Sequence, residues 1–185
     1  MFTELEYKYD AKDVSWSAFE ELMMSLCPTR VASDSSWDLY YTKTDDPNDF
    51  QRFRMGLAPE LTRKVKTSEV NNKERIEVDL PLAPGVSETV ITKYVGLAGY
   101  EPSFKIYKTF QVYWVDSVNY SYYIVYDEEM KELDRFIEVE INKNEVSSML
   151  SPQKVLDEGE KRLKSLGITP QNRKKKSLFE IYKKV

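Results

Sequence analysis

Charged and apolar residues alternate in several short stretches of the sequence, and the charged residues are of the types that bind phosphates and metal ions. In ELEYK, residues 4–8, the alternation would place Glu4, Glu6 and Lys8 on one side of a strand, because successive strand side chains point to opposite faces. The same phase recurs in QRFRM, LTRKVK, ERIEVDL and FIEVEI, which contribute Arg52, Arg54, Thr62, Lys64, Lys66, Arg75, Glu77, Asp79, Glu138 and Glu140. Five strands therefore share a face made almost entirely of acids and bases.

Two arrangements explain such a face. In an open sheet it would be in water, which is the commoner reason for alternation in any single strand. The solvent faces of ordinary sheets also carry Thr, Ser and Gln, however, so five nearly pure acid-and-base faces favour a closed sheet with its charges inside. Buried ions persist only when they are paired, hydrated or bound to a ligand, so a closed sheet predicts a hydrated binding site.

The residue types indicate what that site would bind. Arginine forks and lysines suit phosphate oxygens. The sequence contains no histidine, which excludes the usual general base, the usual zinc ligand and Ser-His or Cys-His nucleophiles. Carboxylates without histidine suit Mg²⁺ or Mn²⁺. These observations together predict a site for a metal-bound triphosphate.

Composition sets further limits. A chain of 185 residues predicts a single domain, residues 1–185, and 41% hydrophobic residues predict a folded one. Cys27 is the only cysteine, which excludes an internal disulfide and fits a reducing compartment. The net charge of -4 argues against general nucleic-acid binding, and the sequence has no apolar run long enough to span a membrane. We expect a cytoplasmic protein that binds no membrane.

Period-two and helical patterns outline the elements. Helical spacing predicts helices over residues 15–27 and 87–98, from Ser151 to Gly167, and from residue 177 onwards. Strand-like runs cover residues 2–10, 37–43, 50–56, 60–67, 73–80, 104–115, 120–127 and 135–142. Because short turns join most consecutive runs, we expect an α+β fold, an eight-stranded antiparallel β-barrel with helices packed outside.

In this order the motifs resemble those of the CYTH domain, or triphosphate tunnel metalloenzyme, family. The stretch GYEPSFKIYK, residues 99–108, is similar to the approach to a phosphate-binding lysine in the branch that includes class IV adenylate cyclases, and KSLFEIY is similar to the terminal helix. The remaining motifs are Glu4-x-Glu6-x-Lys8, Arg52-x-Arg54, Lys64 or Lys66, Arg75-x-Glu77, Asp127, and Glu138-x-Glu140. The resemblance spans almost the whole chain.

The resemblance implies a charged tunnel that holds a triphosphate such as ATP, tripolyphosphate or thiamine triphosphate, with Mg²⁺ or Mn²⁺ as cofactor. The implied triphosphate ligands are Lys8, Arg52, Arg54, Lys64, Lys66, Arg75 and Lys108. The implied metal ligands are Glu4, Glu6, Glu138 and Glu140. The implied catalytic residues are Glu6, Lys8, Glu77 and Asp127. A homodimer is one oligomeric state that the sequence leaves open.

Three activities fit this resemblance. Hydrolysis of the triphosphate is favoured; the alternatives are cyclisation of ATP to cyclic AMP and pyrophosphate, and a non-catalytic module that binds nucleotides or polyphosphate. One departure bears on the choice, since the family usually has Lys-x-Arg where this chain has Lys108, Thr109 and Phe110. Lys105 could replace the missing charge only if a bulge turned it inward.

Overall fold

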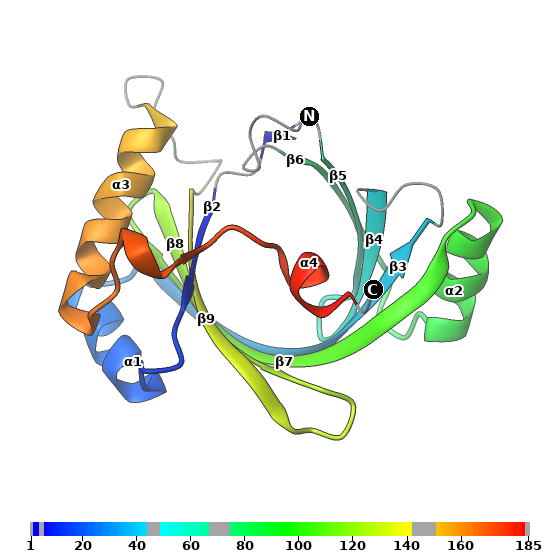
Figure 1. Ribbon diagram of the computed structural model, residues 1–185, viewed down its shortest axis with the longest axis horizontal. Helices are drawn as coiled ribbons and strands as arrows, with labels where there is room; N and C mark the ends of the chain where they lie inside the picture. The colour runs from blue at the N-terminus through cyan, green and yellow to red at the C-terminus, as the bar shows by residue number, and fades with distance from the viewer. Residues whose placement is uncertain (1, 4–5, 44–48, 67–74, 142–150, 184–185) are drawn as a thin grey trace.

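The computed structural model of the chain describes residues 2–3, 6–43, 49–66, 75–141 and 151–183, and all of its strands form one antiparallel sheet (Figure 1). The strands are β1 (Phe2–Thr3), β2 (Glu6–Asp10), β3 (Arg30–Thr42), β4 (Asp49–Met55), β5 (Glu60–Lys66), β6 (Arg75–Pro81), β7 (Glu101–Val115), β8 (Val118–Tyr126), β9 (Glu132–Ile141) and β10 (Arg173–Lys174). Their order across the sheet is β1-β6-β5-β4-β3-β7-β8-β9-β2-β10.

Consecutive pieces of the N-terminus pair with opposite sides of this sheet. Phe2 of β1 lies opposite Glu77 of β6, and Glu6 of β2 lies opposite Glu140 of β9. Three residue steps from Thr3 to Glu6 can span at most about 11 Å, so the chain holds the two sides of the sheet near each other. The predicted antiparallel barrel is confirmed; the run predicted over residues 2–10 contains two strands, β1 and β2, and β10 is an additional short strand. The hydrogen-bonded order is open, and the N-terminal chain brings β1, at one end of the order, near β2, the strand next to the other end.

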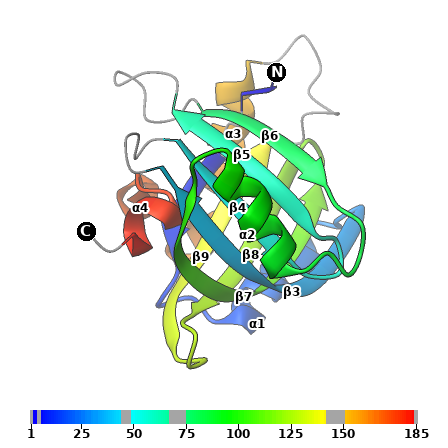
Figure 2. The ribbon, with the colours of Figure 1, turned by 90° about the vertical axis from the view of Figure 1, so that its right-hand side faces the viewer.

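Helices cover the convex face of the sheet at two places (Figures 1 and 2). Helices α1 (Trp16–Ser25) and α3 (Pro152–Arg162), the latter continued by a 3₁₀ turn over Leu163–Leu166, pack on the outer side chains of β2, β8 and β9. Helix α2 (Glu88–Leu97) packs on outer side chains of β3, β4 and β5, including Phe53. Gly159 sets how closely α3 can approach, since a Cβ there would lie 2.9 Å from a methyl carbon of Val139.

The fourth helix, α4 (Leu178–Tyr182), packs on the concave face instead. The ring of Phe179 stacks on Phe50 of β4 with centroids 4.3 Å apart, and Leu178 belongs to the same apolar cluster. The expectation that the helices pack outside therefore holds for α1, α2 and α3 and is wrong for α4. The physical reason is that the inner face is aromatic near this helix, where Tyr40 and Phe104 also stack. Of the helices in the described part of the chain, none has the length and apolar character needed to cross a bilayer.

Candidate functional site

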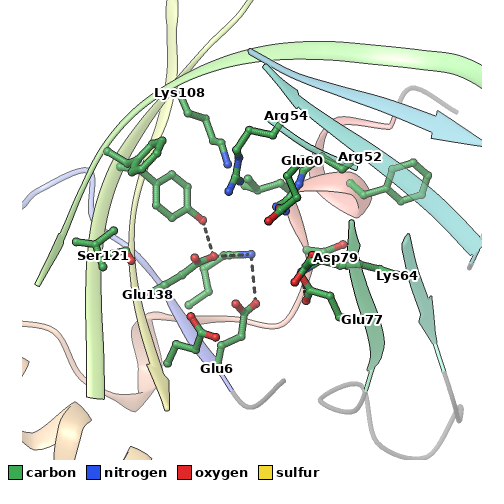
Figure 3. Close-up of a pocket in the computed structure, with 18 of the residues that line it drawn as sticks. Glu6, Arg52, Arg54, Glu60, Lys64, Glu77, Asp79, Lys108, Ser121 and Glu138 are labelled. Atoms are coloured by element: carbon green, nitrogen blue, oxygen red, sulfur yellow. Dashed lines mark hydrogen bonds and ion pairs between the residues drawn. The ribbon is translucent and has the colours of Figure 1, made fainter. Parts of the chain in front are cut away.

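The concave face encloses a cavity of about 380 Å³ (Figure 3). Charged side chains from six strands line it, and the labelled ones in the figure converge on a common space from opposite walls. Among the described residues the basic side chains are Lys8, Arg52, Arg54, Lys64 and Lys108. The acidic ones are Glu6, Glu60, Glu77, Asp79, Glu138 and Glu140. The alternation of charged and apolar residues in the strands thus points both acidic and basic side chains into one cavity.

A fully buried carboxylate, Asp38 of β3, joins two of the cations. Arg54 donates two hydrogen bonds to it, from Nε at 3.0 Å and from Nη2 at 3.2 Å, and Lys108 Nζ lies 2.6 Å from its Oδ2. Burial alone would raise the pKa of Asp38, but the Arg54 guanidinium and the Lys108 ammonium together hold that pKa well below its usual range. Asp38 is therefore ionised and fixes the side chains of Arg54 and Lys108 at the cavity wall.

Lys108, the second cation beside Asp38, is buried. Burial, followed by the nearby Arg54 guanidinium, lowers the pKa of Lys108 to about 7, although Asp38 acts in the opposite direction. Arginines remain protonated, so the lysine is the member of this cluster that releases a proton. An added anion next to Lys108 would favour its charged form.

Arg52 of β4 is held by its neighbours on β5. Its Nη2 donates to Glu60 Oε1 at 2.9 Å and to Thr62 Oγ1 at 2.8 Å. Burial alone would lower the pKa of Arg52, but nearby anions, Asp38 first, raise it above its ordinary value. Its buried Nε has no hydrogen-bond partner among the described residues. A buried donor without a partner is unfavourable, and a phosphate oxygen in the cavity would satisfy it.

On the opposite wall Lys8, Glu138 and Tyr123 form a second cluster. Lys8 Nζ lies 3.2 Å from Glu138 Oε1, and the Tyr123 hydroxyl donates to the same oxygen at 2.7 Å. Burial alone would raise the pKa of Glu138, but Lys8 and then the Tyr123 hydrogen bond lower it. Burial, reinforced by Glu138, raises the pKa of Tyr123 well above its ordinary value. The tyrosine is therefore a neutral donor, and the glutamate is ionised.

Two further glutamates adjoin this second cluster. Glu6 of β2 lies directly opposite Glu140 of β9, and Glu138 is two residues away on the same face. Like charges directly opposite each other in a sheet destabilise it, and a divalent cation would relieve the repulsion. Within the described residues no group of three acidic side chains is close enough to hold a metal alone. The oxygen donors still fit Mg²⁺ or Mn²⁺, because Mg²⁺ is usually bound by one or two carboxylates together with phosphate oxygens and water.

Solved structures share this architecture. A conserved hypothetical protein from Pyrococcus furiosus is 20% identical, with 96% of this chain and 98% of that chain covered and a TM-score of 0.72. A candidate adenylate cyclase from Vibrio parahaemolyticus is 12% identical, with 97% of each chain covered and a TM-score of 0.67. The chain has the CYTH, or triphosphate tunnel, fold.

The same tunnel fold occurs in a chain of the Schizosaccharomyces pombe Mediator head module, at 12% identity, with 89% of this chain and 96% of that chain covered and a TM-score of 0.63. The sequence matches no protein-family profile and no curated protein. At these identities the shared property is the fold, so the activity has to be argued from the tunnel's own residues.

Most of the residues singled out in the sequence lie in the tunnel. Those on the cavity are Glu6, Lys8, Arg52, Arg54, Lys64, Glu77, Lys108, Glu138 and Glu140, with Lys64 Nζ 2.8 Å from Glu77 Oε2. Glu4 lies outside the described residues. For Lys66 and Arg75 only the backbone is described, and it places them opposite each other in β5 and β6.

Asp127, a catalytic residue according to the resemblance, does not line the cavity. It follows β8 in the turn that leads to β9, where its Oδ1 accepts hydrogen bonds from the backbone N–H groups of Glu129 at 3.0 Å and Lys131 at 2.9 Å. An aspartate that bonds to the backbone two residues on is a turn-forming residue. Its acidic type matched the motif, but its carboxylate stabilises the turn.

Phe110 lies on the tunnel wall, as the strand phase predicts, with its ring centroid 5.9 Å from Cζ of Arg54. Lys105 does not replace the missing charge, because its Nζ lies 2.8 Å from Glu88 of α2 on the convex face. The tunnel thus has an aromatic ring where the resemblance places an arginine.

The sequence patterns missed several polar residues in or beside the tunnel, among them Asp38, Glu60 and Tyr123. Asp38 had a usable signal, since pairing residues 37–43 with 50–56 places it directly opposite Arg54. Tyr123 had none, because one of many tyrosines at strand spacing is usually a core residue.

Proposed function

We propose that the chain is a divalent-metal-dependent enzyme that acts on a triphosphate bound in the tunnel, most simply by hydrolysis. The observation that carries the proposal is the set of five basic side chains around a cavity of about 380 Å³, with three glutamates on one wall. This volume falls within the roughly 300–1,000 Å³ typical of small-molecule sites. A structural role alone would not require so many charges in an enclosed space.

The proposed phosphate ligands are Lys8, Arg52, Arg54, Lys64 and Lys108, with Lys66 and Arg75 as further candidates. Ion pairs with Asp38, Glu60, Glu77 and Glu138 stabilise these cations. Within the described part of the chain the Arg52 Nε donor has no hydrogen-bond partner. Because the acids nearly balance the bases, a triphosphate would bring uncompensated negative charge, and a divalent cation that enters with it would restore the balance.

Glu6, Glu138 and Glu140 are the proposed metal ligands, with Glu4 as a further candidate. A bound Mg²⁺ or Mn²⁺ would withdraw charge from the phosphates and orient the attacking oxygen. In the proposal Lys8 contacts the phosphates and lies beside the metal ligands Glu6 and Glu138, whereas Glu77 fixes the orientation of Lys64. Phosphoryl transfer depends on positioning and charge stabilisation, so the reaction needs no protein nucleophile.

Two other activities fit the same tunnel. Cyclisation of ATP is supported by the fold shared with a candidate adenylate cyclase. Binding without turnover is supported by Phe110, an aromatic ring where the resemblance places an arginine, and by the occurrence of the fold in the Mediator head module. Of the two reactions, hydrolysis requires fewer groups in addition to those present in the tunnel.

Product analysis separates the three activities. The protein is incubated with ATP, tripolyphosphate or thiamine triphosphate and Mg²⁺ or Mn²⁺, and the products are resolved by chromatography. Hydrolysis gives a diphosphate and phosphate, cyclisation gives cyclic AMP and pyrophosphate, and a binding module gives no product. Absence of turnover together with absence of binding would refute the proposal.

A matched pair of variants links any activity to the tunnel. Arg52→Ala removes an inner guanidinium, whereas Arg63→Ala removes an outer one, which is half exposed and pairs with Asp49. Loss of one hydrogen bond to a charged group is worth about 1.5–3 kcal/mol, so Arg52→Ala should weaken tripolyphosphate binding by that amount. Arg63→Ala should leave it unchanged. Equal effects of the two variants would place the substrate outside the tunnel.

A further inference from the structure

Beyond Lys108, the inner face of β7 becomes apolar. Its next three inward side chains are Phe110, Val112 and Trp114, all partly exposed and all on the cavity. At roughly 3.3–3.4 Å per residue, Phe110 and Trp114 are about 13 Å apart along the strand. An inorganic polyphosphate has no apolar group that could pack against this apolar wall.

The apolar wall begins where the cations end. Phe110 is two residues from Lys108 on the same face, and its ring lies 5.9 Å from the Arg54 guanidinium. A group covalently attached to a phosphate held by Arg54 and Lys108 would therefore lie against the apolar wall. The aromatic side chains beyond Lys108 in the other direction are already covered, since α4 stacks Phe179 on Phe50.

The wall also carries a polar group suited to a ligand. Asn119 of β8 lies directly opposite Trp114 and lines the cavity, and its buried Oδ1 has no hydrogen-bond partner among the described residues. On β3 the guanidinium of Arg30 lies over the Trp114 ring, 4.6 Å from its centroid. Apolar area with a few placed polar groups is the usual composition of a small-molecule site.

We propose that Phe110, Val112 and Trp114 form a subsite for a flat, ring-containing organic group attached to the triphosphate, with the Asn119 amide as its polar anchor. The inference rests on the proposed triphosphate function and names its substrate class. Phe110 is then a specificity-determining residue: the tunnel gives up one phosphate contact and gains a surface on which a ring can stack. Tripolyphosphate would fill only the charged part of the cavity.

Calorimetry on the full chain with Mg²⁺ tests the subsite. The ligands are tripolyphosphate, thiamine triphosphate and the β,γ-imido analogue of ATP, which has nitrogen in place of the bridging oxygen. At least one ring-bearing ligand should bind about tenfold or more tightly than tripolyphosphate, in line with one stacking contact. Trp114→Ala should remove most of that preference and leave tripolyphosphate binding within twofold. Trp37→Ala is the control, because Trp37 packs against the ring of Tyr107 and lies near Lys105 on the convex face.

A second variant covers the case in which Trp114→Ala fails to fold. Val112→Asn keeps a similar volume and makes the centre of the wall polar, so it should weaken the ring-bearing ligand and spare tripolyphosphate. If all ligands bind equally, or if Trp114→Ala and Val112→Asn change all of them alike, the subsite is refuted while the triphosphate site stands. If none of the ligands binds, the proposed function fails and the subsite fails with it.

Discussion

The Asp38 carboxylate and the Arg54 guanidinium lie directly opposite each other on β3 and β4 and share two hydrogen bonds of 3.0 and 3.2 Å. The carboxylate is fully buried, and its Oδ2 also lies 2.6 Å from Lys108 Nζ. A single acid thus compensates two cations of the tunnel. The phosphate-facing geometry of Arg54 and Lys108 depends on a residue that would not itself contact a phosphate.

Replacing this acid should destabilise the fold strongly. Asp38→Asn keeps the shape of the side chain but leaves Arg54 and Lys108 without their shared counter-charge. Removing one partner of a buried ion pair typically costs about 3–5 kcal/mol, which is the expected loss in the free energy of unfolding measured with urea. Asp116→Asn is the control, since Asp116 pairs with Arg162 at 71% exposure and should lose less than about 1 kcal/mol. Similar losses in both variants would contradict a central role for Asp38.

The low pKa of Lys108 predicts a pH-dependent stability. In the folded chain the pKa is about 7, against 10.5 for an ordinary lysine, so between these values the unfolded state binds a proton that the folded state has released. Stability then rises with pH, by up to about 1.4 kcal/mol per pH unit for one proton. The difference in unfolding free energy between the parent and Lys108→Met should grow in favour of the parent from pH 7 to pH 9. A difference that stays constant over this range would show that Lys108 does not titrate there.

The strand pattern was predictable because it follows from a strict period of two. The alternation predicts strands close to the observed bounds of β4, β5 and β9, at residues 50–56, 60–67 and 135–142. It also predicts that the charged side chains of these strands share one face. Strand β3 starts at Arg30, earlier than the predicted residue 37. The sequence does not predict this start, because RVASDSS has too few apolar residues to show the alternation.

Tertiary features were less predictable. Helix α4 is short and apolar on several sides, and its sequence does not distinguish the concave face from the convex one. Asp127 matched a motif by residue type, but its place in a turn depends on where β8 ends. Asp38 is one charge in an otherwise apolar stretch, and its role appears only when β3 is paired with β4.

Metal binding should depend on Glu140. Glu140→Gln preserves shape, removes one carboxylate charge, and relieves the repulsion with Glu6 directly opposite. Glu138 is a poorer test, because it is the near partner of Lys8 and its loss would also disturb the fold. Mn²⁺ binding in the presence of tripolyphosphate is measured from the electron paramagnetic resonance signal of free Mn²⁺. The Mn²⁺ affinity should fall at least about tenfold, because that is the lower end of the loss in metal affinity when even a residue that only orients a metal ligand is replaced.

The control for this variant is Glu128→Gln, an exposed glutamate in the turn after β8, which should leave Mn²⁺ binding unchanged. Unaltered Mn²⁺ affinity in Glu140→Gln would remove Glu140 from the metal site. Equal weakening in both variants would indicate a general effect of surface charge.

The last prediction concerns Phe110→Arg, which restores the cation that the resemblance leads one to expect. The new guanidinium would lie in the tunnel beside Arg54, with Asp34 of β3 directly opposite as its nearest register partner. Tripolyphosphate should bind more tightly, by about 1.5–3 kcal/mol for one added charge-assisted contact. A ring-bearing triphosphate should lose its advantage over tripolyphosphate, because the stacking surface is gone. Without ligand the melting temperature should fall through repulsion from Arg54, and tripolyphosphate should restore it. Thr109→Arg, one residue earlier and on the opposite face, should change neither affinity. A folded Phe110→Arg variant with the parent's selectivity would show that Phe110 does not determine which triphosphate the tunnel accepts.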